Sequence, residues 1–411
     1  MQSLMPVTAN SQYFIELEEK YGAHNYHPIP VVLKEGRGVF VYDVDDKRYF
    51  DFLSGYSAVN QGHCHPEIVE ALISQASKLT LTSRAFYNDQ LGEYEKFITA
   101  FFGYDKVLPM NTGVEAVETA LKLARRWGYR IKGIPENKAK IIVCANNFHG
   151  RTSTVISFST DPSSTKDFGP FMPGFEIIPY NDLRSLEIAL QDQDVAGFLV
   201  EPIQGEAGVV VPDEGYLQKA KQYCSDARVL FIGDEIQTGL GRTGKMLCCD
   251  HENVRPDILI LGKALSGGTL PVSAVLADNE IMMLIAPGEH GSTYGGNPLA
   301  CHIAITALSV LKNEGLVENA AAMGELLRNE LRALASPAIS TVRGMGLLNA
   351  IVIDHADKEA AWSFCLELKE NGLLAKPTHG DKIRFAPPLT ITRDQMLESV
   401  EIIRKSLHVL V

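Results

Sequence analysis

The 411-residue sequence has no excess of basic charge, because 38 lysine and arginine residues stand against 50 aspartate and glutamate residues, for a net charge of −12. A protein that holds a nucleic-acid backbone or an anionic membrane surface needs a basic face, which this composition disfavours. Long apolar runs are missing too: stretches such as 195–200 are strand-sized, far below the ~20 residues that cross a bilayer. We therefore expect neither nucleic acid nor membrane as a partner.

The first residues show no targeting-signal pattern, and the cysteine and histidine residues are not spaced as in disulfide-rich or metal-binding proteins. The first fourteen residues, MQSLMPVTANSQYF, have neither the apolar core of a secretory signal nor an Arg-rich presequence. This predicts a cytosolic protein. The seven cysteines form no CxxC pair, and their odd number is typical of reduced thiols. We expect the adjacent Cys248 and Cys249 to be buried. His63 and His65 have no second ligand pair at metal spacing, so no metal site is expected.

What the sequence does contain is an alternation of short apolar runs with helical segments. The runs include 141–144 (IIVC), 197–200 (GFLV), 229–233 (VLFIG), 258–261 (ILIL) and 272–277 (VSAVLA). Continuous apolar strands separated by helices predict a mostly parallel sheet covered on both faces. Residues up to about 52 instead predict a helix followed by a hairpin. No internal repeat or Pro/Gly-rich linker separates these parts, so the domains should be interwoven.

Three of the apolar runs are followed by an ionisable residue: Glu201, Asp234 and Lys263. Ligands of parallel sheets bind beyond the carboxyl ends of the strands, so we expect these side chains in one crevice. Lys263 is either a lysine that reaches solvent or a desolvated amine with nucleophilic character. A buried carboxylate at Asp234 needs a cationic partner, and a protonated pyridine nitrogen would be one.

A fourth feature is the start of a strongly helical segment at residues 111–115 (NTGVE). Thr112 and Glu115 are spaced as a capping box, and Gly113 leaves the helix start open to close approach. Exposed amides at such a start suit a phosphate. A phosphate cradle, an amine and a carboxylate are what pyridoxal phosphate requires. Walker-like spacing at 239–245 is rejected as a nucleotide site, because Met246 replaces the residue that would hold magnesium.

Several blocks of the sequence carry a family resemblance. They are AHNYHPIP, DFLSGYSAVNQGHCHP, NTGVEAVETALKLARRWG, NNFHGRT, VEPIQGEAGV, GDEIQTGLGRTGK, LGKALSGG, GSTYGGNPLAC and NGLLAKPTHGDKIRFAPPL. Together, from about residue 21 to 388, they resemble the ornithine δ-aminotransferases. DEIQTG and GKALSGG are similar to the wider class III aminotransferases. AHNYHP and SGYSAVN, with GEAGVVVP, point to the ornithine branch.

The resemblance implies an α/β protein of the pyridoxal-phosphate-dependent transferase fold type I. Its large domain would contain a mostly parallel seven-stranded sheet, and a smaller α+β domain would complete it. The expected boundaries are 1–55 for an N-terminal segment that packs with the small domain, 56–295 for the large cofactor-binding domain and 296–411 for the C-terminal small domain.

The same resemblance assigns cofactor contacts. Lys263 would carry pyridoxal phosphate as a Schiff base and move the proton, and Asp234 would keep the ring nitrogen protonated. Phe148 would stack on the ring and Gln237 would contact its phenolic oxygen. The phosphate would be held by Thr112, Gly113 and Val114, and by Thr293 of a second subunit. A homodimer, or a higher oligomer built from it, is thus expected.

For the substrates, the resemblance implies a charge switch. Arg384 would bind the α-carboxylate of 2-oxoglutarate, and Arg151 its distal carboxylate. With ornithine bound, Glu206 would mask Arg384, so that the substrate carboxylate goes to Arg151 and Tyr26, while Tyr56 shapes the pocket. Taken singly, these residues also suit an ordinary ion pair, a surface charge and core aromatics.

The expected reaction is transfer of the δ-amino group of ornithine to 2-oxoglutarate, giving glutamate 5-semialdehyde and glutamate. Acetylornithine or 4-aminobutyrate transamination is the alternative within the class. Two other classes stay open: a cofactor-binding protein without turnover, and an aminomutase that works without 2-oxoglutarate.

Overall fold

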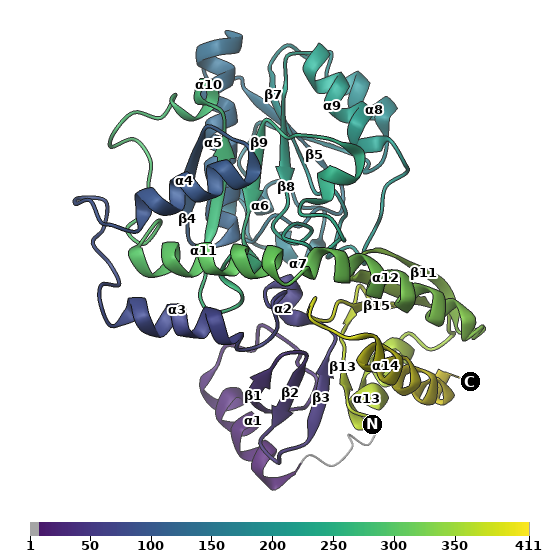
Figure 1. Cartoon of the computed structure of the whole chain (residues 1–411). Helices are drawn as coiled ribbons and strands as arrows, with labels where there is room; N and C mark the ends of the chain where they lie inside the picture. The colour runs from purple at the N-terminus through teal and green to yellow at the C-terminus, as the bar shows by residue number, and fades with distance from the viewer. Residues whose placement is uncertain (1–7, 411) are drawn as a thin grey trace.

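The structure, a computed structural model, describes residues 8–410 and contains three β-sheets with their surrounding helices (Figure 1). Half of the fourteen-residue N-terminal stretch considered above, residues 1–7, lies outside the described residues. The largest sheet and its helices occupy the upper part of the view, and the two smaller sheets lie below. None of the helices within residues 8–410 is long and apolar enough to span a bilayer.

The largest sheet has seven strands and confirms the predicted mostly parallel arrangement. Its spatial order is β4 (Lys106–Met110), β10 (Ser273–Ala277), β9 (Ile258–Leu261), β8 (Leu230–Asp234), β7 (Val195–Val200), β5 (Lys140–Cys144) and β6 (Phe175–Ile178). The five strands from β9 to β6 run parallel, and β10 is antiparallel to both of its neighbours.

Helices cover both faces of this sheet, which is why its strands are apolar throughout. The helix α5 (Gly113–Trp127) packs on one face, while α8 (Leu183–Ala189) and α9 (Tyr216–Asp226) pack on the other. Consecutive strand residues point to opposite faces. In β8, for example, Phe231 belongs to the core under α9 and Ile232 to the core under α5.

One of the two smaller sheets joins the N-terminal and C-terminal parts of the chain, and the other is built from C-terminal strands alone. One contains β1 (Leu33–Arg37), β2 (Phe40–Asp43), β3 (Arg48–Asp51) and β13 (Leu373–Leu374), with β13 parallel to β3. The other contains β11 (Ile339–Met345), β12 (Leu348–Ile353), β15 (Lys382–Phe385) and β14 (Pro377–Thr378). Because β13 pairs with β3, the N-terminal segment lies against the C-terminal part. The boundaries 1–55, 56–295 and 296–411 stay a proposal.

The remaining helices connect and cover the sheets. In Figure 1, α11 crosses below the large sheet and packs against α3 and α4. Cys248 and Cys249 are buried, as predicted. The bounds of these helices are α1 (Ala9–Tyr21), α2 (Ser54–Ser57), α3 (Pro66–Ala76), α4 (Leu91–Phe102), α6 (Ser153–Ile156), α7 (Pro162–Thr165), α10 (Asn279–Met282), α11 (Pro298–Asn313), α12 (Leu316–Ala333), α13 (Ala360–Glu370) and α14 (Arg393–Ser406).

Candidate active site

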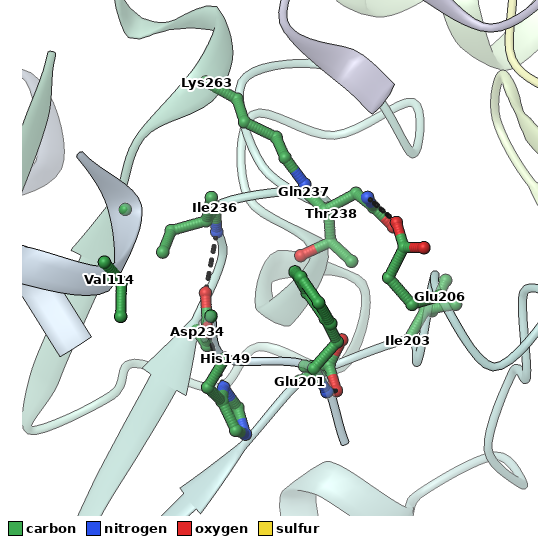
Figure 2. Close-up of a pocket in the computed structure, with 13 residues that line it drawn as sticks. Val114, His149, Glu201, Ile203, Glu206, Asp234, Ile236, Gln237, Thr238 and Lys263 are labelled. Atoms are coloured by element: carbon green, nitrogen blue, oxygen red, sulfur yellow. Dashed lines mark hydrogen bonds and ion pairs between the residues drawn. The ribbon is translucent and has the colours of Figure 1, made fainter. Parts of the chain in front are cut away.

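A cavity of about 190 Å³ lies at the carboxyl ends of β7, β8 and β9 (Figure 2). Glu201, Asp234 and Lys263 all line it, as the strand-end argument predicts. The register explains this, because Val200 pairs with Gly233 in the parallel sheet and the strands therefore end at one level. The other lining residues are Gly113, Val114, Phe148, His149, Gly150, Ile203, Glu206, Ile236, Gln237 and Thr238.

The start of α5 contributes one wall of the cavity through Gly113 and Val114. The predicted capping box is present: the carboxylate of Glu115 accepts the N–H groups of Thr112 at 3.0 Å and Asn111 at 2.9 Å. Amides of a first helical turn have no partner within the helix. Those of Gly113 and Val114 therefore suit an anionic group placed in the cavity.

Two predicted phosphate contacts are not brought to the cavity wall. Thr112 is exposed and precedes the residues that line it. Thr293 is exposed as well, in the loop where Ser292 accepts a hydrogen bond from the Asn111 side chain at 2.7 Å. The expected contact of Thr293 belongs to a second subunit, so it stays a prediction.

Lys263 follows β9 by two residues and points into the cavity (Figure 2). Its backbone φ of 45° lies in the left-handed region, where few non-glycine residues occur. Burial lowers the pKa of its amine to about 8, although the charges of Glu206 and Asp234 oppose this shift. A substantial fraction of the amine is thus neutral, and nucleophilic, near physiological pH.

Asp234 forms a buried contact with a histidine. Its Oδ2 lies 2.6 Å from Nδ1 of His149, and its Oδ1 accepts the N–H of Ile236 at 3.1 Å. Burial lowers the pKa of His149, but the hydrogen bond and charge of Asp234 outweigh burial and raise it overall. Sequence reasoning gave His149 no role. The only available signal is its place beside Phe148 in the NNFHGRT block.

Glu201 is the second carboxylate of the cavity wall. Its side chain accepts the N–H of Phe148 through Oε2 at 3.0 Å, and the residue is 7% exposed. Burial raises the pKa of Glu201 to about 7; the charge of His149 lowers it, and that of Asp234 adds to the rise. Two buried carboxylates that repel each other in a low dielectric do not readily ionise together.

A chain of polar contacts leads from the cavity to the C-terminal sheet. Oε1 of Glu206 accepts from Nη1 of Arg384 at 2.7 Å and from Nε2 of Gln237 at 3.2 Å. Burial raises the pKa of Glu206, but Arg384 more than offsets this, so the pKa is lowered and the carboxylate stays charged. Gly205 makes room for this contact, because a Cβ there would lie 1.5 Å from Oε1 of Gln237.

Tyr56 covers the other side of Arg384. The guanidinium lies over the Tyr56 ring, 4.9 Å from its centre. The φ of Tyr56 is 59°, in the kinked turn of α2, so its side chain is aimed by an uncommon backbone conformation. The structure therefore brings three predicted substrate residues, Glu206, Arg384 and Tyr56, into one contact group.

Of these three residues, Glu206 lines the cavity, whereas Tyr56 and Arg384 lie behind it, and the other two predicted substrate residues are outside the lining as well. Arg151 is exposed, with its guanidinium 5.8 Å from the centre of the Phe148 ring. Tyr26 is 68% exposed. Both are close enough to Tyr56 to influence the pKa of its hydroxyl, which burial raises. Neither carries a contact that fixes it toward the cavity in the described residues.

The cavity fits pyridoxal phosphate in its chemistry. The amides at the start of α5 suit the phosphate, Lys263 offers an amine, and Asp234 offers a carboxylate for the ring nitrogen. A further observation is Oε1 of Gln237, which is buried and has no hydrogen-bond partner among the described residues. Buried polar atoms are normally paired, so a polar group of a ligand would satisfy this oxygen.

The sequence profile of the family described as Aminotransferase class-III matches residues 21–407. The chain belongs to the class III aminotransferases. This class III aminotransferase is 65% identical over 398 residues to a rat protein named "Ornithine aminotransferase, mitochondrial". That alignment covers 97% of the chain and 91% of the rat protein.

Two solved structures resemble this class III aminotransferase over nearly its whole length. An ornithine aminotransferase from Toxoplasma gondii, whose description notes partial occupancy of pyridoxal phosphate at the active site, has a TM-score of 0.96 and 49% identity, and the match covers 97% of this chain and 94% of that one. A protein from Elizabethkingia anophelis described as acetylornithine aminotransferase has a TM-score of 0.91 and 64% identity, with coverage of 98% and 100%.

The expectation of a cytosolic location is wrong on this comparison, since the rat relative is named as a mitochondrial protein. The expectation came from the absence of a presequence pattern in fourteen residues. Such an absence describes only that stretch and identifies no compartment. Composition and charge, which are shared across compartments, could not correct it.

Proposed function

We propose that this class III aminotransferase uses pyridoxal phosphate to transfer the δ-amino group of L-ornithine to 2-oxoglutarate. The products are glutamate 5-semialdehyde, which cyclises to pyrroline-5-carboxylate, and glutamate, formed in two ping-pong half-reactions. The observation that carries this proposal is the Glu206–Arg384 ion pair beside the amine of Lys263. Arg384 is an arginine able to bind a substrate carboxylate, and in this structure the carboxylate of Glu206 already occupies it.

The residues proposed to hold the cofactor act on different parts of it. Pyridoxal phosphate, when bound, withdraws electrons from the substrate carbon that bears the amine. Lys263 carries the cofactor, Asp234 keeps its ring nitrogen protonated, and Gln237 donates to or accepts from its phenolic oxygen. Phe148 covers the ring, and the phosphate is held by Thr112, Gly113 and Val114, with Thr293 of a second subunit.

Lys263 is also the proposed catalytic base and acid. A pKa near 8 leaves its amine able both to accept a proton and to return it at neutral pH. With the cofactor bound, Nζ of Lys263 would take the proton from the substrate carbon that bears the amine and would return it within the same site. The apolar walls formed by Val114, Ile203 and Ile236 keep water away from this transfer.

Substrate choice rests on the state of Arg384. While Glu206 holds it, the arginine is unavailable to a substrate α-carboxylate, so ornithine binds through Arg151 and Tyr26 and presents its δ-amine to Lys263. When 2-oxoglutarate enters, its α-carboxylate replaces Glu206 on the guanidinium, and its distal carboxylate goes to Arg151. Tyr56 stacks against the arginine and shapes the pocket for ornithine.

The proposed assembly is a homodimer, or a higher oligomer built from it. Its support is the exposed position of Thr293 outside the cavity lining, which leaves the phosphate site without one expected hydroxyl in a single chain. A second subunit would supply that group. Size measurement in solution, with and without cofactor, tests this.

Acetylornithine transamination is the second candidate, favoured by the description of the 64% identical Elizabethkingia protein. In that case the acylated amine would be the spectator group, and Tyr26 and Tyr56 would matter little. 4-Aminobutyrate, which has a distal carboxylate but no α-amino group, is a third donor to compare.

The deciding experiment mixes the cofactor-loaded protein with ornithine, acetylornithine or 4-aminobutyrate and follows the absorbance band of the bound cofactor. We expect ornithine to bleach the band fastest and 2-oxoglutarate to restore it. Faster bleaching by acetylornithine would overturn the ornithine assignment. Turnover without 2-oxoglutarate would indicate an aminomutase, and no bleaching by any amine a binding protein.

A further inference from the structure

Glu201 is the strand-end residue of the cavity for which the proposed reaction has no role. Like Asp234 and Lys263, it follows a strand of the large sheet and lines the cavity. It does not pair with Arg384, which is bound by Glu206, and it has no amine to carry the cofactor. The residue is only 7% exposed, and a buried carboxyl group is costly unless it is hydrogen-bonded or neutral. Its position therefore needs a physical reason.

The contacts of Glu201 tie it to the segment between β5 and α6. Oε2 of Glu201 accepts the backbone N–H of Phe148 at 3.0 Å. The next residue, His149, is held by Asp234 through its Nδ1 at 2.6 Å. Residues 148 and 149 are thus anchored at two points, each by a carboxylate from the end of a neighbouring strand. Figure 2 shows Glu201, Asp234 and His149 in the same part of the cavity.

The charged groups around Glu201 decide whether its carboxyl group is ionised or neutral. The ionisable groups that act on it or feel its charge come from several elements: His149, Asp234, Glu206, Lys263, Cys144 and Tyr180. Of the two carboxylates nearest His149, Asp234 has the hydrogen-bonded contact with the imidazole. A second negative charge at Glu201 would repel Asp234, and burial also disfavours it.

We propose that Glu201 is a positioning residue that, as a neutral acid, fixes the Phe148 backbone and so orients Phe148 and His149 behind the cofactor ring. In this form the Glu201–Asp234 pair holds a single negative charge, at Asp234, where the ring nitrogen requires it. Ionisation of Glu201 adds a second charge to the wall. The part of this proposal that concerns the cofactor ring rests on the proposed function, whereas the anchoring of the Phe148 backbone by Glu201 does not.

The first test follows the backbone amide resonance of Phe148 by NMR in the full-length protein as pH is varied. In the wild type this resonance moves through neutral pH, because its acceptor changes charge. Glu201→Gln keeps an acceptor oxygen of the same shape but cannot ionise, so the movement is lost. Glu235→Gln is the matched control: Glu235 is also buried and follows β8, but it does not line the cavity, and its carboxylate accepts from Thr238 and the Cys249 amide instead of from Phe148.

A Phe148 resonance that titrates alike in the wild type and in Glu201→Gln, or that is unmoved in the wild type, overturns the proposal. The second test measures the affinity of the apoprotein for pyridoxal phosphate. Glu201→Gln should bind it like the wild type, whereas Glu201→Ala, which removes the acceptor, should bind about ten-fold more weakly. Equal affinity of the alanine variant also overturns it. Neither test uses turnover, so a wrong substrate assignment leaves both readable.

Discussion

Two parts of the site are built in different ways: the floor, formed by Asp234 and Lys263, and the substrate side, formed by Glu206, Tyr56 and Arg384. Asp234 and Lys263 follow buried strands of one sheet, and their positions are set by the strand register. On the substrate side, Glu206 comes from a loop, Tyr56 from a kinked turn and Arg384 from the C-terminal sheet. A rigid floor suits a cofactor that stays in place, and a composite substrate side suits a pocket that must accept two different substrates in turn.

Loss of the amine at the floor should have the largest effect. Lys263→Ala removes both the cofactor attachment and the proposed acid-base group, so the rate of the ornithine half-reaction should fall by about 1,000-fold or more. Stopped-flow absorbance measures it. Lys245→Ala, at an exposed lysine between β8 and β9, is the control and should keep the wild-type rate. A Lys263→Ala variant with wild-type turnover would refute the proposed floor.

Removing the internal mask should act on the substrate side alone. Glu206→Gln leaves Arg384 without its charged partner, so kcat/KM for ornithine should fall by about 10- to 100-fold, the usual range when one member of a buried charge pair is lost. The half-reaction with glutamate, which needs a free Arg384, should be unaffected or faster. An equal fall in kcat/KM for ornithine and for glutamate would mean that Glu206 also supports Asp234 and Lys263, and the two parts of the site would not be independent.

The floor also has a pH signature. With a pKa near 8, the Lys263 amine is protonated at lower pH and becomes a neutral nucleophile as pH rises. The rate at which apoprotein takes up pyridoxal phosphate covalently should therefore increase about ten-fold per pH unit below the midpoint and level off above it. Rapid-mixing absorbance gives the profile. A midpoint near the ordinary lysine value would show that burial does not lower this pKa.

The smallest of these effects is expected at Tyr56. Tyr56→Phe keeps the ring against Arg384 but removes the hydroxyl, so kcat/KM for ornithine should fall by about ten-fold or less, as for one polar contact. The glutamate half-reaction serves as internal control. If acetylornithine is instead the better donor of the wild type and Tyr56→Phe leaves it unchanged, the substrate side belongs to the second candidate.

The residues of the floor could be predicted from sequence patterns more completely than those of the substrate side. Apolar runs that end in Asp234 and Lys263 identify the floor, because parallel strands end together. The Glu206–Arg384 pair joins a loop and a strand whose residues are 178 positions apart, so only family resemblance predicts it. His149 was missed because its role depends on a contact with Asp234, 85 residues away, which no local pattern encodes.

The most direct test of the account is a crystal structure of the protein grown with pyridoxal phosphate. We predict electron density continuous from Nζ of Lys263 to the cofactor, with its ring nitrogen at the Asp234 carboxylate and its phosphate at the amides of Gly113 and Val114. Cofactor density elsewhere, or within this cavity but attached to another residue or with the phosphate away from α5, would contradict the account.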